Sequence, residues 1–280
     1  MQDEIGFDDI KLNYVTIAAA RAMAGLRLVL GAYTIPGPWR ESCKCLFDVK
    51  GIPYTSVRCA NAGATETSFG ADGSHSELLA WTAQSSAPVA IWADERPRST
   101  WIDQLNLAER LAPEPRLVPL DFEARVRMFG LINEIAGEHG LGWNKRLFLI
   151  DQALKSAAPG SADYTFWSVL AEKYLYTAAM GLAAKARIIE IVCKLDAELL
   201  RSRERGSRYF VGASLSALDI YSACFYALLD PLPPALCPMA SSYRPAYRNA
   251  DPDIEQAMGS ALKDHRDFIY REHLRLPVVF

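Results

Sequence analysis

The chain has 280 residues, half of them hydrophobic and 22% charged, as in an ordinary soluble protein. Its net charge of -3 at pH 7 argues against a surface that binds nucleic acid. No apolar run is long enough to span a bilayer, and the acidic, polar first residues do not resemble a secretory signal, so we expect a cytoplasmic protein without a membrane partner.

The first part of the chain predicts a helix, a strand, a second helix and a second strand. Residues 15–25 (VTIAAARAMAG) favour a helix, and residues 26–33 (LRLVLGAY) favour a buried strand. Residues 39–51 predict a helix that ends at Gly51, and residues 52–60 carry alternating β-formers. The strand, helix and strand from residue 26 onward have the length of a βαβ unit.

The next stretch alternates between loops and short elements. Residues 61–74 are rich in Gly, Ala, Thr and Ser and predict a loop, and a short helix is expected over 75–83. Residues 87–92 (APVAIW) predict a strand, 93–98 a turn with a short further strand, and 99–113 a helix.

After residue 119 the pattern is helical throughout. The proline-rich segment 113–119 is typical of a linker. Helices are expected over 121–139, roughly 161–204, 216–230 and 252–273, with a long irregular stretch at 230–251. We therefore predict an extension (1–25), an α/β domain (26–112), the linker (113–119) and an all-helical domain (120–280).

One helix start in the second domain carries a capping signal. Ser216 precedes the expected helix, and Asp219 follows three residues later. The serine oxygen can accept from the Asp219 backbone N–H, while the carboxylate accepts from the Ser216 N–H. We interpret this pair as a structural cap.

The cysteines and histidines indicate no metal site. No two cysteines have CxxC spacing, and no two histidines are four residues apart. Cys43 and Cys45 fall past the first turn of the expected helix and point in different directions, so we expect both to pack as small apolar residues.

Four short motifs in order carry a resemblance to a known family. These are KGIPY (50–54), SAPVAIW (86–92), STWIDQLNLAERLAP (99–113) and SALD (216–219). The chain resembles an atypical, bacterial-type member of the cytosolic glutathione transferase superfamily over about residues 26–275. The resemblance implies a thioredoxin-like α/β domain followed by an all-α helical bundle, with glutathione as co-substrate and no metal.

The resemblance also places the glutathione site. It implies a cis peptide bond at Ala87–Pro88, which presents the Ala87 backbone to the cysteinyl part of glutathione. Ser99 and Thr100 stand where the family commonly has an acidic residue and a serine that receive the glutamyl end. The acidic residue is absent here, but hydroxyls and N–H groups at a helix start can hold a carboxylate.

The residue that usually activates the thiol is also absent. In the serine, cysteine and threonine branches of the family it precedes a proline, and Gly37 stands there before Pro38. Three candidates replace it: the helix start with Arg40, the hydroxyl of Thr34, and the hydroxyl of Tyr33. A cation at a helix N-terminus lowers a thiol pKa. The alternative is that Arg40 is a solvated surface residue.

The resemblance places the second substrate beside the same helix start. Trp39 is expected to overhang the acceptor pocket from one side. On the other side, glycines in residues 137–147 (GEHGLGWNKRL) suggest a loop that presents Trp143 and Asn144, with His139 as a candidate base. Alternatively, His139 is an exposed helix-end residue and Trp143 a core residue.

We therefore expect a glutathione-dependent transferase that acts on a small apolar or aromatic electrophile by conjugation, thiolytic cleavage or isomerisation. By resemblance it is a cytoplasmic homodimer. The glycine at position 37 keeps open an alternative: a non-catalytic binding or scaffold protein with the same fold.

Overall fold

The computed structural model describes residues 12–31, 36–64, 73–239 and 244–279, and these form two compact units. The first unit contains the described residues up to 117 together with 232–239 and 270–279. The second unit contains residues 118–231 and 244–269.

The first unit is built on a mixed sheet of the order β1-β3-β2-β4. The central strand β2 (Leu26–Val29) pairs in parallel with β3 (Tyr54–Val57) and antiparallel with β4 (Val89–Trp92). The two-residue strand β1 (Tyr14–Val15) adds to the free edge of β3 in parallel. All four residues of β2 are buried, and three of them are apolar. The fourth, Arg27, donates to the carbonyls of Met23 and Ala93.

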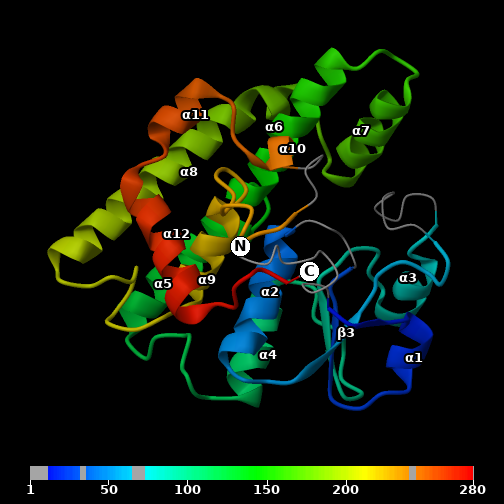
Figure 1. Cartoon of the computed structure of the whole chain (residues 1–280), viewed down its shortest axis with the longest axis horizontal. Coiled ribbons are helices and arrows are strands. Elements are labelled where there is room, and N and C mark those ends of the chain that lie inside the picture. The colour runs from blue at the N-terminus through cyan, green and yellow to red at the C-terminus, as the bar shows by residue number, and fades with distance from the viewer. Residues whose placement is uncertain (1–11, 32–35, 65–72, 240–243, 280) are drawn as a thin grey trace, which may run out of the picture. The chain divides into compact units, whose positions relative to one another are not determined.

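Helices cover both faces of this sheet (Figure 1). On one side α2 (Pro38–Val49) packs against α4 (Trp101–Leu111). On the other side lie α1 (Ile17–Arg21) and α3 (Ser76–Thr82). A buried cluster joins α1 and α3 to the sheet, formed by Ile17, Ala20, Val29, Val57, Cys59, Leu78, Val89 and Ile91.

The predicted α/β class and the order of the main elements are confirmed, with one exception. The further strand expected over 93–98 is wrong, because only an isolated bridge forms between Ala90 and Arg98. Ala93 has a positive φ of 47°, and Pro97 has no backbone N–H to donate to a ladder. The additional strand of the sheet is instead β1, which precedes the predicted helix α1.

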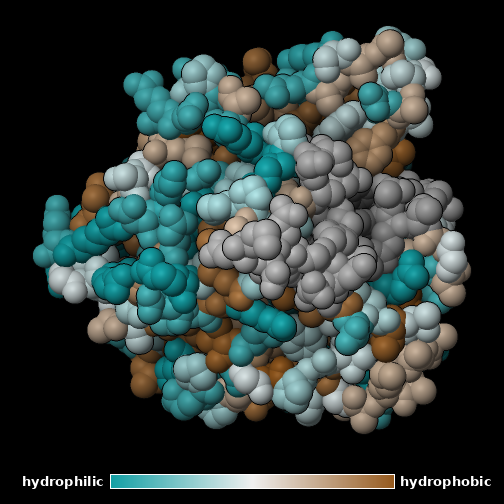
Figure 2. All heavy atoms as spheres, in the orientation of Figure 1, coloured by the Kyte–Doolittle hydropathy of each residue, from teal (hydrophilic) through white to brown (hydrophobic). Residues whose placement is uncertain are grey.

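The second unit is helical among its described residues. Its helices are α5 (Phe122–Ala136), α6 (Leu141–Ser156), α7 (Ala162–Lys173), α8 (Ala178–Glu204), α9 (Ala217–Tyr226), α10 (Arg244–Tyr247), α11 (Pro252–Ala257) and most of α12 (Ser260–His273). Helix α6 packs against α7 and α8, and α5 packs against α9, which is buried throughout. On the face shown in Figure 2, hydrophilic side chains gather over α8, α11 and α12.

The helix boundaries differ from the sequence-based expectation in three places. The helix expected over 252–273 is divided into α11, which ends at its C-cap Met258, and α12. The loop predicted over 137–147 is wrong, because α6 begins at Leu141. A Cβ added to Gly137 would lie 2.6 Å from the Asn133 carbonyl oxygen. A Cβ added to Gly140 would lie 2.8 Å from the Glu134 carbonyl oxygen. The glycines therefore permit a tight turn between two helices.

The single helix expected over roughly 161–204 is interrupted. It ends as α7 at Lys173 and resumes as α8 after the N-cap Thr177, with Leu175 at a positive φ of 52° between them. In the described residues of the stretch expected to be irregular (230–251), α10 forms a short helix. None of the helices in the described ranges combines the length and apolar character needed to cross a membrane.

Candidate active site at the start of α2

Helix α2 begins at a glycine followed by a proline. Gly37 is the N-cap, and Pro38 occupies the first turn, where its missing N–H costs nothing. The carbonyl of Gly37 accepts the N–H of Glu41 at 2.8 Å. Because the first N–H groups of a helix have no partner within it, this end carries partial positive charge.

The side chain of Arg40 folds back over this helix start. Its Nη1 donates to the carbonyl of Leu30, at the end of β2, over 3.0 Å. A Cβ added to Gly37 would lie 2.7 Å from the Arg40 Nε and 2.8 Å from its Nη2. Gly37 has an ordinary extended backbone, with φ -65° and ψ 124°. The glycine thus leaves room for a guanidinium where another residue would place its side chain.

The buried face of α2 carries the charged pair Glu41 and Lys44, with their side chains 2.8 Å apart. The Lys44 ammonium also donates to the carbonyl of Val279. Burial alone would lower the pKa of Lys44, but the Glu41 carboxylate raises it. Lys44 therefore stays charged and is neutralised by Glu41.

Cys43 and Cys45 are both buried, as predicted for packing residues. Burial, with a further contribution from the Asp48 charge, raises the pKa of the Cys43 thiol. A thiol kept protonated is a poor nucleophile.

The Ala87–Pro88 peptide bond is cis, as predicted. The segment that holds it is tied to α4 by Gln104, which the sequence reasoning missed. Gln104 is buried, and its Nε2 donates to the carbonyls of Pro88 at 3.2 Å and Arg98 at 3.3 Å. The sequence does contain a signal for this role, because Gln104 is a polar residue one turn before Ala108 on the apolar face of α4.

Ser99 and Thr100 lie at the start of α4, where they were expected. Thr100 is the N-cap, and its Oγ1 accepts the Asp103 N–H at 3.2 Å. A hydroxyl that accepts one bond can still donate its own hydrogen. Thr100 is exposed and Ser99 is half-buried, so both are within reach of solvent.

The remaining candidates are placed as follows. Tyr33 and Thr34 lie outside the described residues, and Trp39 is half-buried beside Arg40. In the second unit, the Nδ2 of buried Asn144 donates to the carbonyls of His139 at 2.6 Å and Gly140 at 2.9 Å, which closes the turn into α6.

His139 is exposed with a positive φ of 62°, and half-buried Trp143 packs its ring edge on Tyr174 with centroids 4.9 Å apart. Over the described part of the chain, no three His, Cys, Asp or Glu side chains lie close enough together to hold a metal ion.

No protein-family model and no curated protein matches the sequence. Solved structures do match. Ure2p in complex with glutathione has a TM-score of 0.58 at 10% identity, covering 89% of this chain and 95% of that one. The β-etherase LigF from Sphingobium sp. strain SYK-6 has a TM-score of 0.53 at 15% identity, covering 83% and 98%.

Glutathione transferase Omega 3C from Trametes versicolor also has a TM-score of 0.53, at 16% identity, covering 92% of this chain and 90% of that one. At these identities the likeness concerns the fold. The chain has the glutathione transferase fold, with a thioredoxin-like unit followed by a helical one.

Proposed function

We propose that this protein is a glutathione-dependent transferase that activates the thiol of glutathione at the start of α2. The observation that carries the proposal is the position of the Arg40 guanidinium, folded over Gly37 and bonded to the Leu30 carbonyl. It occupies the space beside the position where related enzymes carry their activating side chain.

A guanidinium at this place suits thiolate chemistry. A nearby cation and the N-terminus of a helix both favour the charged form of a thiol, so they lower its pKa. The positive end of the α2 dipole lies at these first residues of the helix and adds to the charge of the guanidinium. Arg40 stabilises the thiolate by charge, and no side-chain base at position 37 is needed.

The rest of glutathione is held by neighbouring parts of the first unit. The backbone of Ala87, next to Pro88, pairs with the cysteinyl part. Ser99 and Thr100, with the first N–H groups of α4, receive the carboxylate of the glutamyl end, which the helix dipole favours. This assignment rests on the resemblance and on the position of half-buried Ser99 and exposed Thr100 at the start of α4.

The second substrate is a small apolar or aromatic electrophile that rests against Trp39. The thiolate attacks an electrophilic carbon, a carbon–sulfur bond forms, and a leaving group departs with the bonding electrons, or a double bond accepts them. Conjugation, thiolytic cleavage and isomerisation all begin with this attack. The similar structures include an enzyme named for ether cleavage, which supports this range of chemistry.

The test combines binding with turnover. Calorimetric titration should show that the protein binds glutathione, and Arg40→Ala should then reduce turnover of a generic aryl halide. A charge-assisted hydrogen bond contributes roughly 1.5–3 kcal/mol, which is about ten- to a hundredfold in rate if it acts in the transition state. The matched control is Arg116→Ala, which removes a partly exposed arginine elsewhere in the first unit.

Gly37 also favours a second candidate, a binding or scaffold protein that keeps the fold without catalysis. This candidate predicts that no electrophile is turned over and that Arg40→Ala changes nothing but binding. Absence of binding to both reduced and oxidised glutathione would refute the transferase proposal and leave the scaffold role.

A further inference from the structure

The helical unit contains a hollow of about 720 Å³ that the proposed glutathione site does not use. It lies between the first turns of α5 and the segment that links α8 to α9. Its size falls within the range of small-molecule pockets. It is lined by Glu123, Ala124, Arg127, Ser202, Arg205, Gly206, Ser207, Arg208, Tyr209, Phe210, Val211, Gly212 and Ala213.

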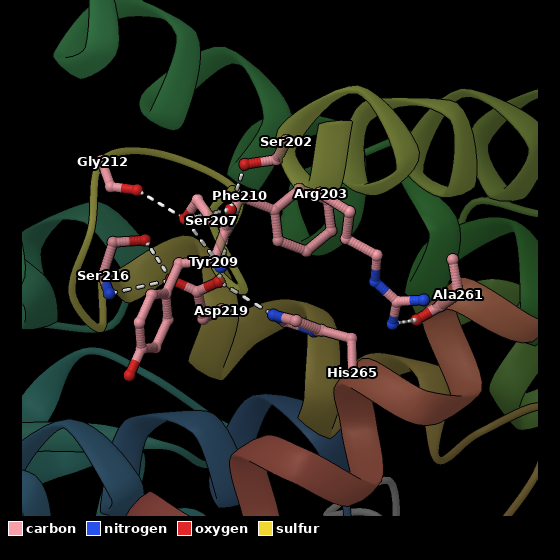
Figure 3. Close-up of polar contacts among 10 residues, drawn as sticks. All are labelled: Ser202, Arg203, Ser207, Tyr209, Phe210, Gly212, Ser216, Asp219, Ala261 and His265. Atoms are coloured by element: carbon pink, nitrogen blue, oxygen red, sulfur yellow. Dashed lines mark hydrogen bonds and ion pairs between the residues drawn. The ribbon is translucent and has the colours of Figure 1, made fainter. Parts of the chain in front are cut away.

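The wall formed by the linking segment is held by side-chain hydrogen bonds (Figure 3). Ser202 Oγ donates to the Tyr209 carbonyl at 2.5 Å, and Ser207 Oγ donates to the Gly212 carbonyl at 2.6 Å. The Phe210 N–H donates to Asp219 Oδ1 at 3.0 Å. These bonds fix the wall before any ligand arrives, which reduces the ordering cost of binding.

Arginines dominate the charged groups around the hollow. Arg127, Arg205 and Arg208 line it with a single carboxylate, Glu123. Glu198 and Arg201 do not line the hollow, but Glu198 forms ion pairs with both Arg127 and Arg201. These four arginines and two glutamates leave a surplus of two positive charges.

The three lining arginines differ in their partners. Arg208 lies over the ring of Phe268 at 3.6 Å from its centroid, so its fork is held in place. For Arg205 the described residues supply no ion-pair partner. Burial, together with the charges of Arg205 and Arg201, lowers the pKa of Arg127, as expected where like charges converge.

We propose that this arginine-lined hollow binds the phosphate group of a small organic molecule. Arginine forks match phosphate oxygens in a bidentate way, and a phosphate monoester carries between one and two negative charges at neutral pH, close to the surplus on the wall. Ala124 and the ring of Tyr209, which line the hollow and are half-buried, provide an apolar surface for the organic part. The site is separate from the residues proposed for glutathione and is independent of that proposal.

The test is calorimetric titration of the whole protein with phenyl phosphate and, separately, with inorganic phosphate. Phenyl phosphate should bind at one site and more tightly than inorganic phosphate, because only the ester contacts the apolar wall. Arg205→Gln and Arg208→Gln should each weaken its binding at least tenfold, and added salt should weaken it further. Saturating glutathione should leave the affinity unchanged.

The matched control is Arg271→Gln, which removes an exposed arginine of α12 that is paired with Glu272. It should bind phenyl phosphate as the unaltered chain does. The proposal is overturned if phenyl phosphate does not bind, if the control loses as much affinity as the two hollow variants, or if glutathione displaces the ligand. Equal affinities for phenyl phosphate and inorganic phosphate would overturn the role of the apolar wall.

Discussion

Gly37 shows what the absence of one side chain does at the candidate site. From the sequence, the glycine indicated only that the usual activating group was missing. The structure places the Arg40 guanidinium within 2.7 Å of the point where a Cβ would begin. The sequence named Arg40 as a candidate, but the folded-back conformation depends on the Leu30 carbonyl at the end of another element.

Replacing Gly37 tests this placement. Gly37→Ala should displace the guanidinium and lower turnover about as much as Arg40→Ala, roughly ten- to a hundredfold. Its free energy of unfolding should change by less than about 1 kcal/mol, because the backbone is unstrained and the arginine can move aside. Steady-state kinetics at saturating glutathione and chemical denaturation measure the two quantities.

Gly37→Ser distinguishes the effect of displacing the guanidinium from the effect of adding a hydroxyl. It displaces the guanidinium in the same way but supplies a hydroxyl at the position that precedes Pro38. Turnover above that of Gly37→Ala is expected. If the serine and alanine variants both match the unaltered protein, Gly37 does not stand beside the reacting thiol.

Asp219 is the residue at which the sequence prediction was correct but incomplete. The capping box with Ser216 is present, and the Ser216 N–H donates to Asp219 Oδ2 at 2.8 Å. The same carboxylate also accepts the Phe210 N–H and lies 2.9 Å from His265 Nε2. His265 is 46 residues away and Phe210 lies outside the helix that Asp219 begins, so the local capping pattern reveals neither partner.

Asp219→Asn should therefore cost more than the loss of an ordinary cap. The carboxylate faces four polar groups, because the Ser216 Oγ also donates to Asp219 Oδ2, at 2.6 Å. An amide cannot accept from all four, so buried donors lose their partner, at about 2–4 kcal/mol of unfolding free energy. Asp163→Asn, in the exposed first turn of α7, should cost less than about 0.5 kcal/mol. Chemical denaturation measures both changes. Equal losses of unfolding free energy in the two variants would contradict the role of Asp219 as a buried acceptor for several donors.

At the scale of elements, residue periodicity and the signals at element ends were enough to predict α2, β3 and α4 from the sequence. Gly51 follows α2 with a positive φ of 63°, and Thr100 caps α4, as such residues do. The start of α6 was missed because closely spaced glycines predict a loop, whereas here they allow two helices to meet. Strand β1 was missed because two residues carry no periodicity, and its pairing with β3 is a tertiary effect.

Helix α6 contains a buried lysine that makes stability depend on pH. Burial, and then the charge of Arg146, lowers the pKa of Lys145 from 10.5 to about 8. Between these values the unfolded chain binds more protons than the folded one, so stability rises as the pH rises from about 8 to about 10.5. Below this window the folded state carries the full cost of a buried ammonium.

Lys145→Met should therefore stabilise the protein at pH 7, by on the order of 3 kcal/mol. The advantage over the unaltered chain should shrink as the pH is raised toward 10. Lys194→Met, at an exposed position of α8, should show no such trend. Chemical denaturation at several pH values measures this difference, and an advantage that is constant with pH would contradict the low pKa.

For the whole molecule, the sequence predicted the change from mixed α/β to all-helical structure near residue 119. It did not predict that residues 232–239 and 270–279 group with the first unit. Lys44 bonding to the Val279 carbonyl is one such link, and it joins positions 235 residues apart. Contacts of this range leave no local pattern in the sequence.

The predicted homodimer rests on the resemblance and is open to a direct check. Near the start of α5, Leu120, Phe122 and Val126 are exposed apolar residues, which is typical of a contact surface. Light scattering at micromolar concentration should give twice the mass of one chain, and Phe122→Glu should weaken the association. A single-chain mass for the unaltered protein would contradict the dimer.

The most direct test of the central claim is to titrate the thiol of bound glutathione by the ultraviolet absorbance of its thiolate. A free cysteine thiol titrates near pH 8.5, so a midpoint below about 7.5 is expected in the complex. In Arg40→Ala the midpoint should return toward that of free glutathione while the tripeptide still binds. A midpoint that is unmoved in the unaltered protein, or equally low in Arg40→Ala, would contradict activation of the thiol by Arg40 at the start of α2.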